Sequence, residues 1–528
     1  YSQIVVRSKF KVKSKTCHRH GSYERMMMKK ALLSLLASSA ITAAATAASA
    51  QTPTDARIAV AITETISGYN PYADPVVLLS NVWCQVYGCI TRYDFDQNAF
   101  VPYLAESVRS VDPLTWEILL PEGATRHNGD PVLAQDIVHS IDYLGNNPAS
   151  GKSYLVAGWS KVEAIDDRTV RITTATPDAT VPDNLAGVAV TSKALYDQMG
   201  EAMFKNAPFG AGPYKLDTVS IGEHIVISRN DTHPMVSPNN PAQIMYRIMP
   251  EPEQRVTALA NGEVQIAQSV PPQLIARVAD LPNAQIVTTN SVEMMFLAMS
   301  PKTHPWDRKE ARQAVAHAIN REAIVRAILR DQAELLDGPV SAGQIGYDPE
   351  FSSAYDYSPE KARALLQSAG LEGVEVTLST PVGRYTADRQ ITEAMVPMLE
   401  AAGFKVTLDT PEWATLWANV QQGKVPFYYM GRGSMIDPSR ALHQYFATGG
   451  SPRLGFSDPE LDALLAAERS EFDPAVRDQK MRAVVRHLVD AAPAAFMWQH
   501  KMAWGISKEV SFKPRPADQV NGWEIFVN

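Results

Sequence analysis

Strand patterns and helix patterns alternate along the second half of the chain, from about Lys309 onward. The helix patterns carry apolar residues at a helical spacing, and the strand patterns between them are short apolar runs. A helix start is marked at Ser358-Pro359, where a capping side chain precedes a proline. Such an alternation is typical of α/β proteins. The chain has 528 residues, which exceeds a single core, so we expect about two or three domains.

The first 50 residues have the features of a leader for export. Residues 1–25 are basic without apolar periodicity, and we interpret them as an upstream extension, with translation starting at one of Met26, Met27 or Met28. A Lys-Lys pair and an Ala-rich apolar stretch follow, and residues 48–50 form a small-x-small cleavage motif. We therefore expect a secretory signal peptide that is cleaved after Ala50. No later stretch is long and apolar enough to span a bilayer.

The mature chain, which would start at Gln51, is acidic. Removing the leader takes away nine of the 49 Lys and Arg residues and one of the 57 Asp and Glu residues, so the formal net charge moves from −8 to about −16. This balance argues against nucleic acids and anionic membrane surfaces as partners.

Two cysteines, Cys84 and Cys89, belong to the mature chain. An exported compartment permits a disulfide, but a spacing of five would place the two side chains on different faces of one continuous helix. The alternatives are a bridge and two buried apolar cysteines. The spacing, without a nearby His or Cys, does not indicate a metal site.

No catalytic motif emerges along the chain: the GxSxG, HExxH, phosphate-loop and CxxC patterns do not occur. An exported, acidic α/β protein without them points to binding rather than turnover, with no catalytic residue, cofactor or metal. An exported hydrolase is the alternative from a different class, and it would need a nucleophile or paired carboxylates in a cleft.

The stretch from Gln422 to Pro438, QGKVPFYYMGRGSMIDP, is a candidate for presenting groups to a ligand. Residues 425–430 are apolar and aromatic, which predicts a buried strand. A Gly-Arg-Gly sequence ends this strand, and Arg432, Ser434 and Asp437 follow in quick succession. A buried strand that opens into a polar loop is how α/β proteins present groups to ligands, whereas an ordinary surface turn is the alternative.

Residues 115–144, TWEILLPEGATRHNGDPVLAQDIVHSIDYL, resemble the hallmark segment of the extracellular solute-binding proteins of peptide and nickel ABC transporters, family 5. Arg126 to Pro131 stand where that family usually has Phe-His-Asp-Gly-x-Pro. Further similar blocks follow in the same order: GAGPY at 210–214, ALANGEVQI at 258–266, EARQAVAHAINREAI at 310–324, residues 357–370, residues 384–406 and residues 456–467. Together the blocks extend over nearly all of residues 56–528.

The resemblance implies an α/β fold with two lobes, a hinge between them and an extra subdomain. Lobe I would comprise residues 51–290 and a C-terminal return at 498–528, with the extra subdomain at about 92–205. Lobe II would comprise residues 291–497. The hinge would lie in strands near 292–299 and 495–506, and a ligand would be enclosed as the lobes close.

The function implied by this resemblance is the periplasmic substrate-binding component of an ABC importer. Such a protein is not an enzyme; it acts as a monomer and delivers its ligand to a membrane permease whose ATPase subunits supply the energy. We expect a peptide-like or carboxylated small molecule, such as a blocked peptide or an opine. An ordinary di- or oligopeptide and a nickel chelate are the alternatives within the family.

The resemblance also directs attention to the loop after residue 430. Peptide binders of this family carry a Trp and then an Asp there, and the Asp pairs with the amino group of the ligand. Aligned on Asp437, these positions are Gly431 and Ser434, and a Ser cannot supply the countercharge that a buried ammonium needs. Arg432 would instead favour a carboxylate or phosphate.

The predicted ligand-binding residues combine this loop with nearby basic and aromatic side chains. For the aromatic residues, packing in the core is the alternative. For Arg384, a solvated loop arginine is the alternative. The predicted set is Arg432, Ser434, Asp437, Arg384, Tyr429, Trp413 and Trp498.

Overall fold

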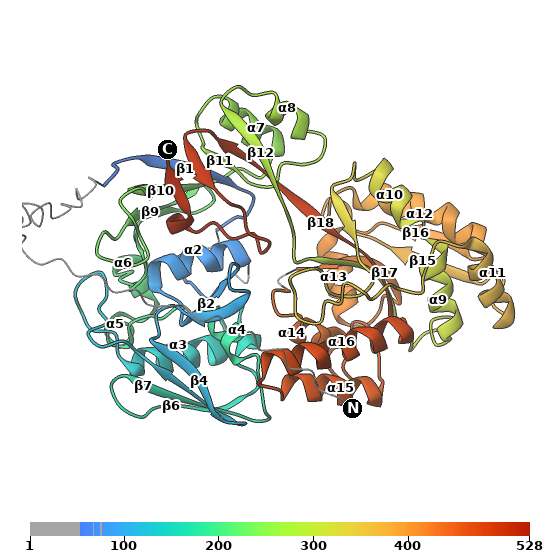
Figure 1. Cartoon of the computed structure of the whole chain (residues 1–528), viewed down its shortest axis with the longest axis horizontal. Helices are drawn as coiled ribbons and strands as arrows, with labels where there is room; N and C mark the ends of the chain where they lie inside the picture. Colours follow the sequence, from blue (N-terminus) through green and yellow to red (C-terminus); the bar gives the residue numbers. More distant parts are fainter. Residues whose placement is uncertain (1–52, 67, 74–75, 434) are drawn as a thin grey trace, which may run out of the picture. The chain divides into compact units, whose positions relative to one another are not determined.

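The computed structural model describes residues 53–66, 68–73, 76–433 and 435–528 (Figure 1). The expected leader, its cleavage motif and Ser434 lie outside the described residues. Within the described part of the chain, no helix has both the length and the apolar character that crossing a membrane requires.

One mixed sheet of twelve strands runs through the described residues. Its order is β16-β15-β17-β13-β18-β11-β1-β10-β9-β8, and β12 and β14 pair with β18 beside this path. The strands are β1 (Arg57–Ile62), β8 (Tyr214–Ser220), β9 (His224–Arg229), β10 (Gln243–Ile248), β11 (Ile266–Ala267), β12 (Ala284–Asn290), β13 (Met294–Met299), β14 (Ala333–Leu335), β15 (Glu375–Ser379), β16 (Lys405–Asp409), β17 (Phe427–Arg432) and β18 (Ala494–Ser507).

The long strand β18 joins two lobes. Its first residues pair with β13, and its residues from Lys501 to Ser507 pair with β12 (Figure 1). Lobe I holds β1 and β8 to β12, and lobe II holds β13 to β17. The chain therefore passes between the lobes twice on adjacent strands, once between β12 and β13 and once within β18.

Lobe II shows why its sequence alternates between helix and strand. The strand β13, MMFLAM, is buried on both faces. Its odd-numbered residues from Met295 pack in one core with α9, α11 and α12, and its even-numbered residues from Met294 pack in a second core with α13 to α16. The helices are α9 (Lys309–Ala318), α10 (Arg321–Ala327), α11 (Pro359–Ser368), α12 (Asp388–Ala402), α13 (Trp413–Gln421), α14 (Ser439–Phe446), α15 (Pro459–Arg469) and α16 (Pro474–Ala491). The α/β prediction is confirmed.

The first half of the chain adds an antiparallel sheet of four strands in the order β4-β5-β7-β6. The helix α3 (Ala134–Asn146) packs against β6 and β7 of this sheet. The other elements of this half are α2 (Val77–Tyr87), β2 (Thr91–Asp94), β3 (Ala99–Pro102), β4 (Ser107–Asp112), β5 (Thr115–Leu119), β6 (Trp159–Ala164), β7 (Thr169–Thr174), α4 (Val181–Leu185), α5 (Lys193–Met199), α6 (Met203–Asn206), α7 (Pro252–Ala260) and α8 (Ile275–Ala279). Near the C-terminus, β19 (Val510–Phe512) pairs with β20 (Ile525–Val527).

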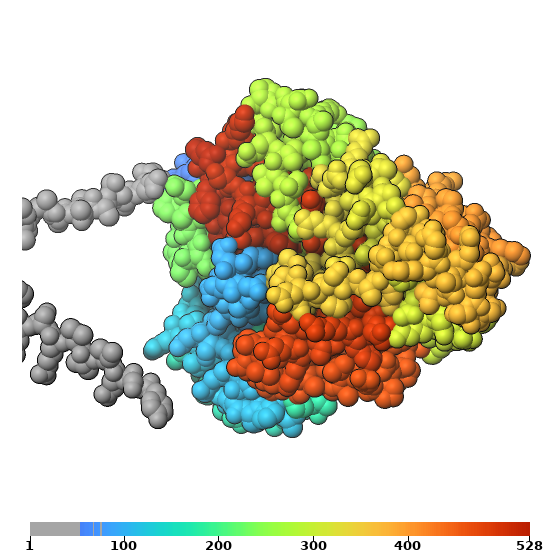
Figure 2. All heavy atoms as spheres, turned by 45° about the vertical axis from the view of Figure 1, so that its right-hand side comes forward, coloured from blue at the N-terminus to red at the C-terminus, as the bar shows by residue number. Residues whose placement is uncertain are grey.

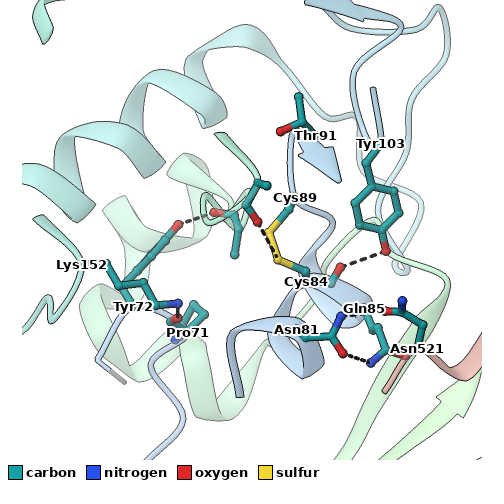
Figure 3. The surroundings of a disulfide bond; sticks show 12 residues. Pro71, Tyr72, Asn81, Cys84, Gln85, Cys89, Thr91, Tyr103, Lys152 and Asn521 are labelled. Carbon is teal, nitrogen blue, oxygen red and sulfur yellow. Dashed lines mark hydrogen bonds between the residues drawn. A yellow bond between two sulfur atoms is a disulfide. The ribbon is translucent and has the colours of Figure 1, made fainter. Parts of the chain in front are cut away.

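Cys84 and Cys89 form a disulfide at the end of α2 (Figure 3). The geometric objection to a bridge assumed one continuous helix, but α2 ends at Tyr87 and Gly88 adopts a φ of 78°. Glycine reaches this left-handed region without steric cost, so the chain turns and brings the two Cα atoms to 5.0 Å. The hydroxyl of Tyr103 donates to the carbonyl oxygen of Cys84 and fixes the same turn.

Candidate functional site: a cavity between the lobes

A cavity of about 850 Å³ lies between the two lobes. Val77 and Asp518 contribute to its lining from the lobe I side, and Trp413, Arg432 and Arg453 contribute from lobe II. Residues 500–503 of β18 line it between them. The volume is in the usual range for sites that take small molecules.

The lobes also touch through α15, away from the strands that join them. The guanidinium of Arg469 donates to both carboxylate oxygens of Asp178, at 3.0 and 2.9 Å, and the backbone N–H of Ala179 donates to the carbonyl oxygen of Arg469. The rings of Trp116 and Phe472 lie 5.8 Å apart at their centroids. Figure 2 shows the orange-red helices of this region against the blue-to-cyan first half of the chain. The cavity is therefore bounded by contacts between the lobes as well as by the crossing strands.

Arg432, the last residue of β17, brings an uncompensated positive charge to the cavity. Its guanidinium forms no ion pair with any described residue, and its Nε is buried without a hydrogen-bond partner among them. Burial lowers the pKa of Arg432, and the positive charges of Arg440 and Arg453 lower it further. Three arginines thus converge on one side of the cavity.

Arg453 and a fourth arginine, Arg384, lie on aromatic rings of the cavity wall. The guanidinium carbon of Arg453 lies 4.6 Å from the ring centroid of Trp417, and that of Arg384 lies 5.2 Å from the ring centroid of Trp413. The two Trp rings stack on one another, with centroids 5.4 Å apart. Neither Arg384 nor Arg453 forms an ion pair with a described residue. Stacking fixes a guanidinium in place while leaving its edge N–H groups free to donate to an anion.

Arg440 differs from these arginines because it is engaged across the lobes. It donates to the side-chain oxygen of Asn184 at 3.1 Å and lies 3.8 Å from a carboxylate oxygen of Asp183. Its guanidinium also lies over the ring of Tyr154. Burial raises the pKa of Asp183 to about 6, although the charge of Arg440 opposes this rise.

Carboxylates line another part of the cavity. Burial raises the pKa of Glu293, and the charge of Arg384 offsets part of that rise. Burial, together with the negative charges of Glu64 and Glu293, raises the pKa of Asp518 to about 7, and the amide of Gln268 donates to Asp518 at 2.6 Å. Oδ1 of Asp518 and Oε2 of Glu64 are buried without a hydrogen-bond partner among the described residues. Negative charge is therefore concentrated here without a matching ion pair.

The comparisons with known proteins decide the family. Residues 99–453 match the family model of bacterial extracellular solute-binding proteins, family 5, middle region. The chain belongs to this family. It is similar to the glutathione-binding protein GsiB of Pectobacterium atrosepticum, at 26% identity over 493 residues that cover 90% of this chain and 94% of that one. Curated relatives named as ABC transporter peptide-binding proteins include one of Brucella ovis, 25% identical over 429 residues that cover 77% of this chain and 80% of that one.

Solved structures agree on the two-lobed binding-protein fold. The protein AgaA of A. tumefaciens R10, in complex with agropinic acid, has a TM-score of 0.74 at 25% identity and covers 89% of this chain and 99% of its own. HbpA2 of Haemophilus parasuis has a TM-score of 0.79 at 21% identity, covering 89% of this chain and 100% of its own. The family resemblance drawn from the sequence blocks and the fold class are confirmed. This family is a family of solute-binding proteins of ABC importers and not an enzyme family.

Three of the seven predicted ligand-binding residues of this family 5 protein, Arg432, Arg384 and Trp413, line the cavity. Tyr429 and Trp498 do not: both are fully buried in the core of lobe II, with ring centroids 6.2 Å apart. These two side chains pack in the core, because helices cover β17 and β18 at the positions of the two rings.

Asp437 also has a different place from the one predicted. Its buried carboxylate accepts from the guanidinium of Arg477 at 2.6 and 3.1 Å and from the backbone N–H of Ser439 at 2.9 Å. Glu468 accepts from the same guanidinium at 3.2 Å. Asp437 is thus bound where α14 begins and does not line the cavity. Ser434 lies outside the described residues, so its predicted role has no structural description.

Sequence reasoning missed Glu293, Asp518 and Arg453. Glu293 immediately precedes the buried strand β13, and a charged residue at the entry to an apolar strand between the lobes was the available signal. Asp518 and Arg453 lie in loops without a motif. Within the described residues, no group of three or more His, Cys, Asp or Glu side chains could hold a metal ion.

Proposed function

We propose that this protein is the periplasmic receptor of an ABC importer and that it captures a carboxylated small molecule between its lobes. Export by the Ala-rich leader, with cleavage after Ala50, would deliver it to the periplasm. The ligand would enter the cavity, the lobes would close on it, and the closed protein would dock on a permease with its ATPase subunits. This cycle requires binding and release only, without turnover.

One observation carries the ligand class: the guanidinium of Arg432 lies in the cavity without an anion among the described residues. A buried cation without a partner is costly unless another group neutralises it. Arg453 and Arg384 present further donors that are held on aromatic rings. A carboxylate accepts two parallel hydrogen bonds from a guanidinium, so the arrangement suits a carboxylated ligand.

The names of the relatives fit this chemistry. Glutathione, in the name of the Pectobacterium protein, carries two carboxylates, and agropinic acid, bound to AgaA, is also an acid. A short peptide with a free carboxylate is the second candidate within the same cavity, because relatives are named as peptide-binding proteins.

A thermal-shift panel tests this proposal. Carboxylic acids that include glutathione, short acidic peptides and opines would be compared with their amides or esters at equal concentration. A ligand at a hundredfold excess over its Kd should stabilise the protein by about 2.7 kcal/mol. We expect the acids to raise Tm and their neutral derivatives to have little effect. Equal stabilisation by acids and amides would contradict the proposal. Hydrolysis of a labelled ligand would show that the protein is an enzyme.

A further inference from the structure

The cavity has a second charged part that the arginines do not explain. Glu293 and Asp518 both line this part of the cavity. Burial raises the pKa of each carboxyl group, and the charge of Glu293 raises the pKa of Asp518 further. We propose that Glu293 and Asp518 form a subsite for a cationic amino group, so that the ligand is a zwitterion with its carboxylate on the Arg432 side. This inference rests on the proposed function.

The strand β17 separates the carboxylate of Glu293 from the guanidinium of Arg432. Side chains alternate between the faces of a strand, so Gly431 and Arg432 lie on opposite faces. Arg432 lies on the face of β17 that Met430 shares, where Tyr445, Arg440 and Arg453 are found. Glu293 lies against the other face. A ligand that crosses the end of β17 would therefore meet the carboxylate of Glu293, with Arg384 near it, on one side and the guanidinium groups of Arg432 and Arg453 on the other.

Gly431 makes room for the carboxylate of Glu293. A Cβ atom added at Gly431 would lie 2.6 Å from Oε1 of Glu293 and 2.6 Å from Sδ of Met295, which is closer than such atoms approach. Gly431 does not have the left-handed backbone conformation that requires glycine. The absence of a side chain at residue 431 is thus explained by the space that Glu293 occupies beside the cavity.

Neutral acceptors in the same lining also lack donors. Oε1 of Gln332 and Nε2 of His500 are buried without a hydrogen-bond partner among the described residues, and both residues line the cavity. Burial lowers the pKa of His500 to about 4, so its ring is neutral and can accept through the nitrogen without a proton. Oδ1 of Asp518, a carboxylate oxygen, is also buried without a hydrogen-bond partner among the described residues. An ammonium group, which has three donors and no acceptor, is the complementary ligand group.

The protein's own cations do not neutralise the carboxylates. Lys501, which lines the cavity, lies 3.6 Å from Glu334. Arg384 lowers the pKa of Glu293 by its charge but forms no ion pair with it within 4.0 Å among the described residues, and it lies over Trp413 instead. The side chains that act on the pKa of Asp518 are Glu64, Glu293 and Gln268, none of which is a cation. The charge of Arg255 acts on Glu64, but the guanidinium of Arg255 donates to backbone carbonyl oxygens, including that of Gln268. Among the described residues, no cation therefore forms an ion pair with Glu293 or Asp518.

Residue 434 is a Ser where the peptide binders of this family carry an Asp. A Ser at that position excludes an ammonium group only if no other carboxylate reaches the cavity. Glu293 and Asp518 come from distant parts of the chain and supply such carboxylates. The protein can therefore bind a free amine without an acidic residue in the loop that follows β17.

Matched ligand pairs test the subsite. The probes are glutathione, Ala-Glu and Ala-Ala-Glu, each with a free and with an acetylated amino group, titrated calorimetrically into the full mature chain. Acetylation removes the positive charge and keeps the carboxylates. We expect the free amine of at least one pair to bind at least tenfold more tightly than its acetylated partner.

Variants assign the effect to the subsite. Glu293→Gln and Asp518→Asn should each reduce the preference for the free amine at least fivefold, while Glu375→Gln, an exposed carboxylate on β15, should leave it unchanged. Gly431→Ala should displace the carboxylate of Glu293 and weaken the free amine more than the acetylated form. This last variant keeps every charge. It therefore tests the position of the Glu293 carboxylate, whereas Glu293→Gln tests its charge.

The outcomes separate this inference from the function on which it rests. Equal affinity for both members of a pair, or a preference for the acetylated form, would overturn the amine subsite and leave a carboxylate receptor. The same conclusion would follow if no probe bound and the compound that co-purifies with the protein were a carboxylic acid without a basic nitrogen. A co-purified compound without any acidic group would overturn the proposed function itself.

Discussion

Replacing Arg432 by alanine should separate binding from stability. The Arg432 guanidinium has no anionic partner among the described residues and is repelled by Arg440 and Arg453, so its loss removes no ion pair from the unliganded protein. A hydrogen bond to a charged group contributes about 1.5–3 kcal/mol, and so the Kd for a carboxylated ligand should rise about 10- to 150-fold. The Tm of the unliganded protein should stay the same or rise slightly.

The assay is calorimetric titration together with thermal unfolding of the unliganded variant. Arg432→Lys should fall between the native protein and Arg432→Ala, because lysine keeps the charge and loses the planar fork. Arg389→Ala, an exposed arginine of α12 that pairs with Glu393, serves as the matched control with unchanged Kd. An unchanged Kd for Arg432→Ala, or a fall of its unliganded Tm by more than that of the control, would refute the reasoning.

Three further predictions concern proton linkage, closure and the corrected role of a carboxylate. Asp518, with a pKa of about 7, is protonated in the free protein at about pH 6 and must ionise to pair with an ammonium group. Binding of a free-amine ligand at that pH should therefore release up to one proton. The Kd should rise up to about tenfold for each pH unit below pH 7. Titration in two buffers of different ionisation enthalpy measures this release, and none at pH 6 would contradict the pairing. Asp178→Asn removes the charged partner of Arg469 at the contact between the lobes. We therefore expect the Kd to rise about tenfold and the radius of the liganded protein in small-angle scattering to increase. An unchanged scattering radius and Kd would argue against a role of this contact in closure. Asp437→Asn leaves the buried charge of Arg477 with one anionic partner fewer. It should therefore lower the free energy of unfolding by about 3 kcal/mol in urea titrations and leave the Kd unchanged within about twofold. A large change in Kd without a loss of stability would show that Asp437 contacts the ligand.

Local patterns predicted the elements of the fold well. The strand expected at residues 425–430 is observed as Phe427–Arg432, two residues later, because Gly431 and Arg432 still pair with Met295 and Met294 of β13. The helix start at Ser358 is confirmed, since the Ser358 hydroxyl accepts from the N–H of Lys361. These features depend on residues close in sequence or on a run of apolar side chains, which a single sequence shows directly.

The site was harder to predict because its members are distant in sequence. Arg477, which binds Asp437, lies forty residues further along the chain, so a loop carboxylate could not be distinguished from a ligand group. Tyr429 and Trp498 are aromatic, as residues that line a pocket often are, but helices cover both side chains and bury them in the core. Glu293 and Asp518 meet only because the chain crosses twice between the lobes and then returns through its C-terminal segment.

The identity of the compound that the protein binds in the cell shows whether the ligand carries both an acidic and a basic group. Native mass spectrometry of the protein, purified without denaturation from cells that produce it, should show one small molecule per chain. After release, that compound should carry at least one carboxylate and one basic amino group, and adding it back should raise Tm. A compound that lacks an acidic group, or a protein that is stabilised equally by the acid and its amide, would contradict the proposal that the protein captures a carboxylated ligand.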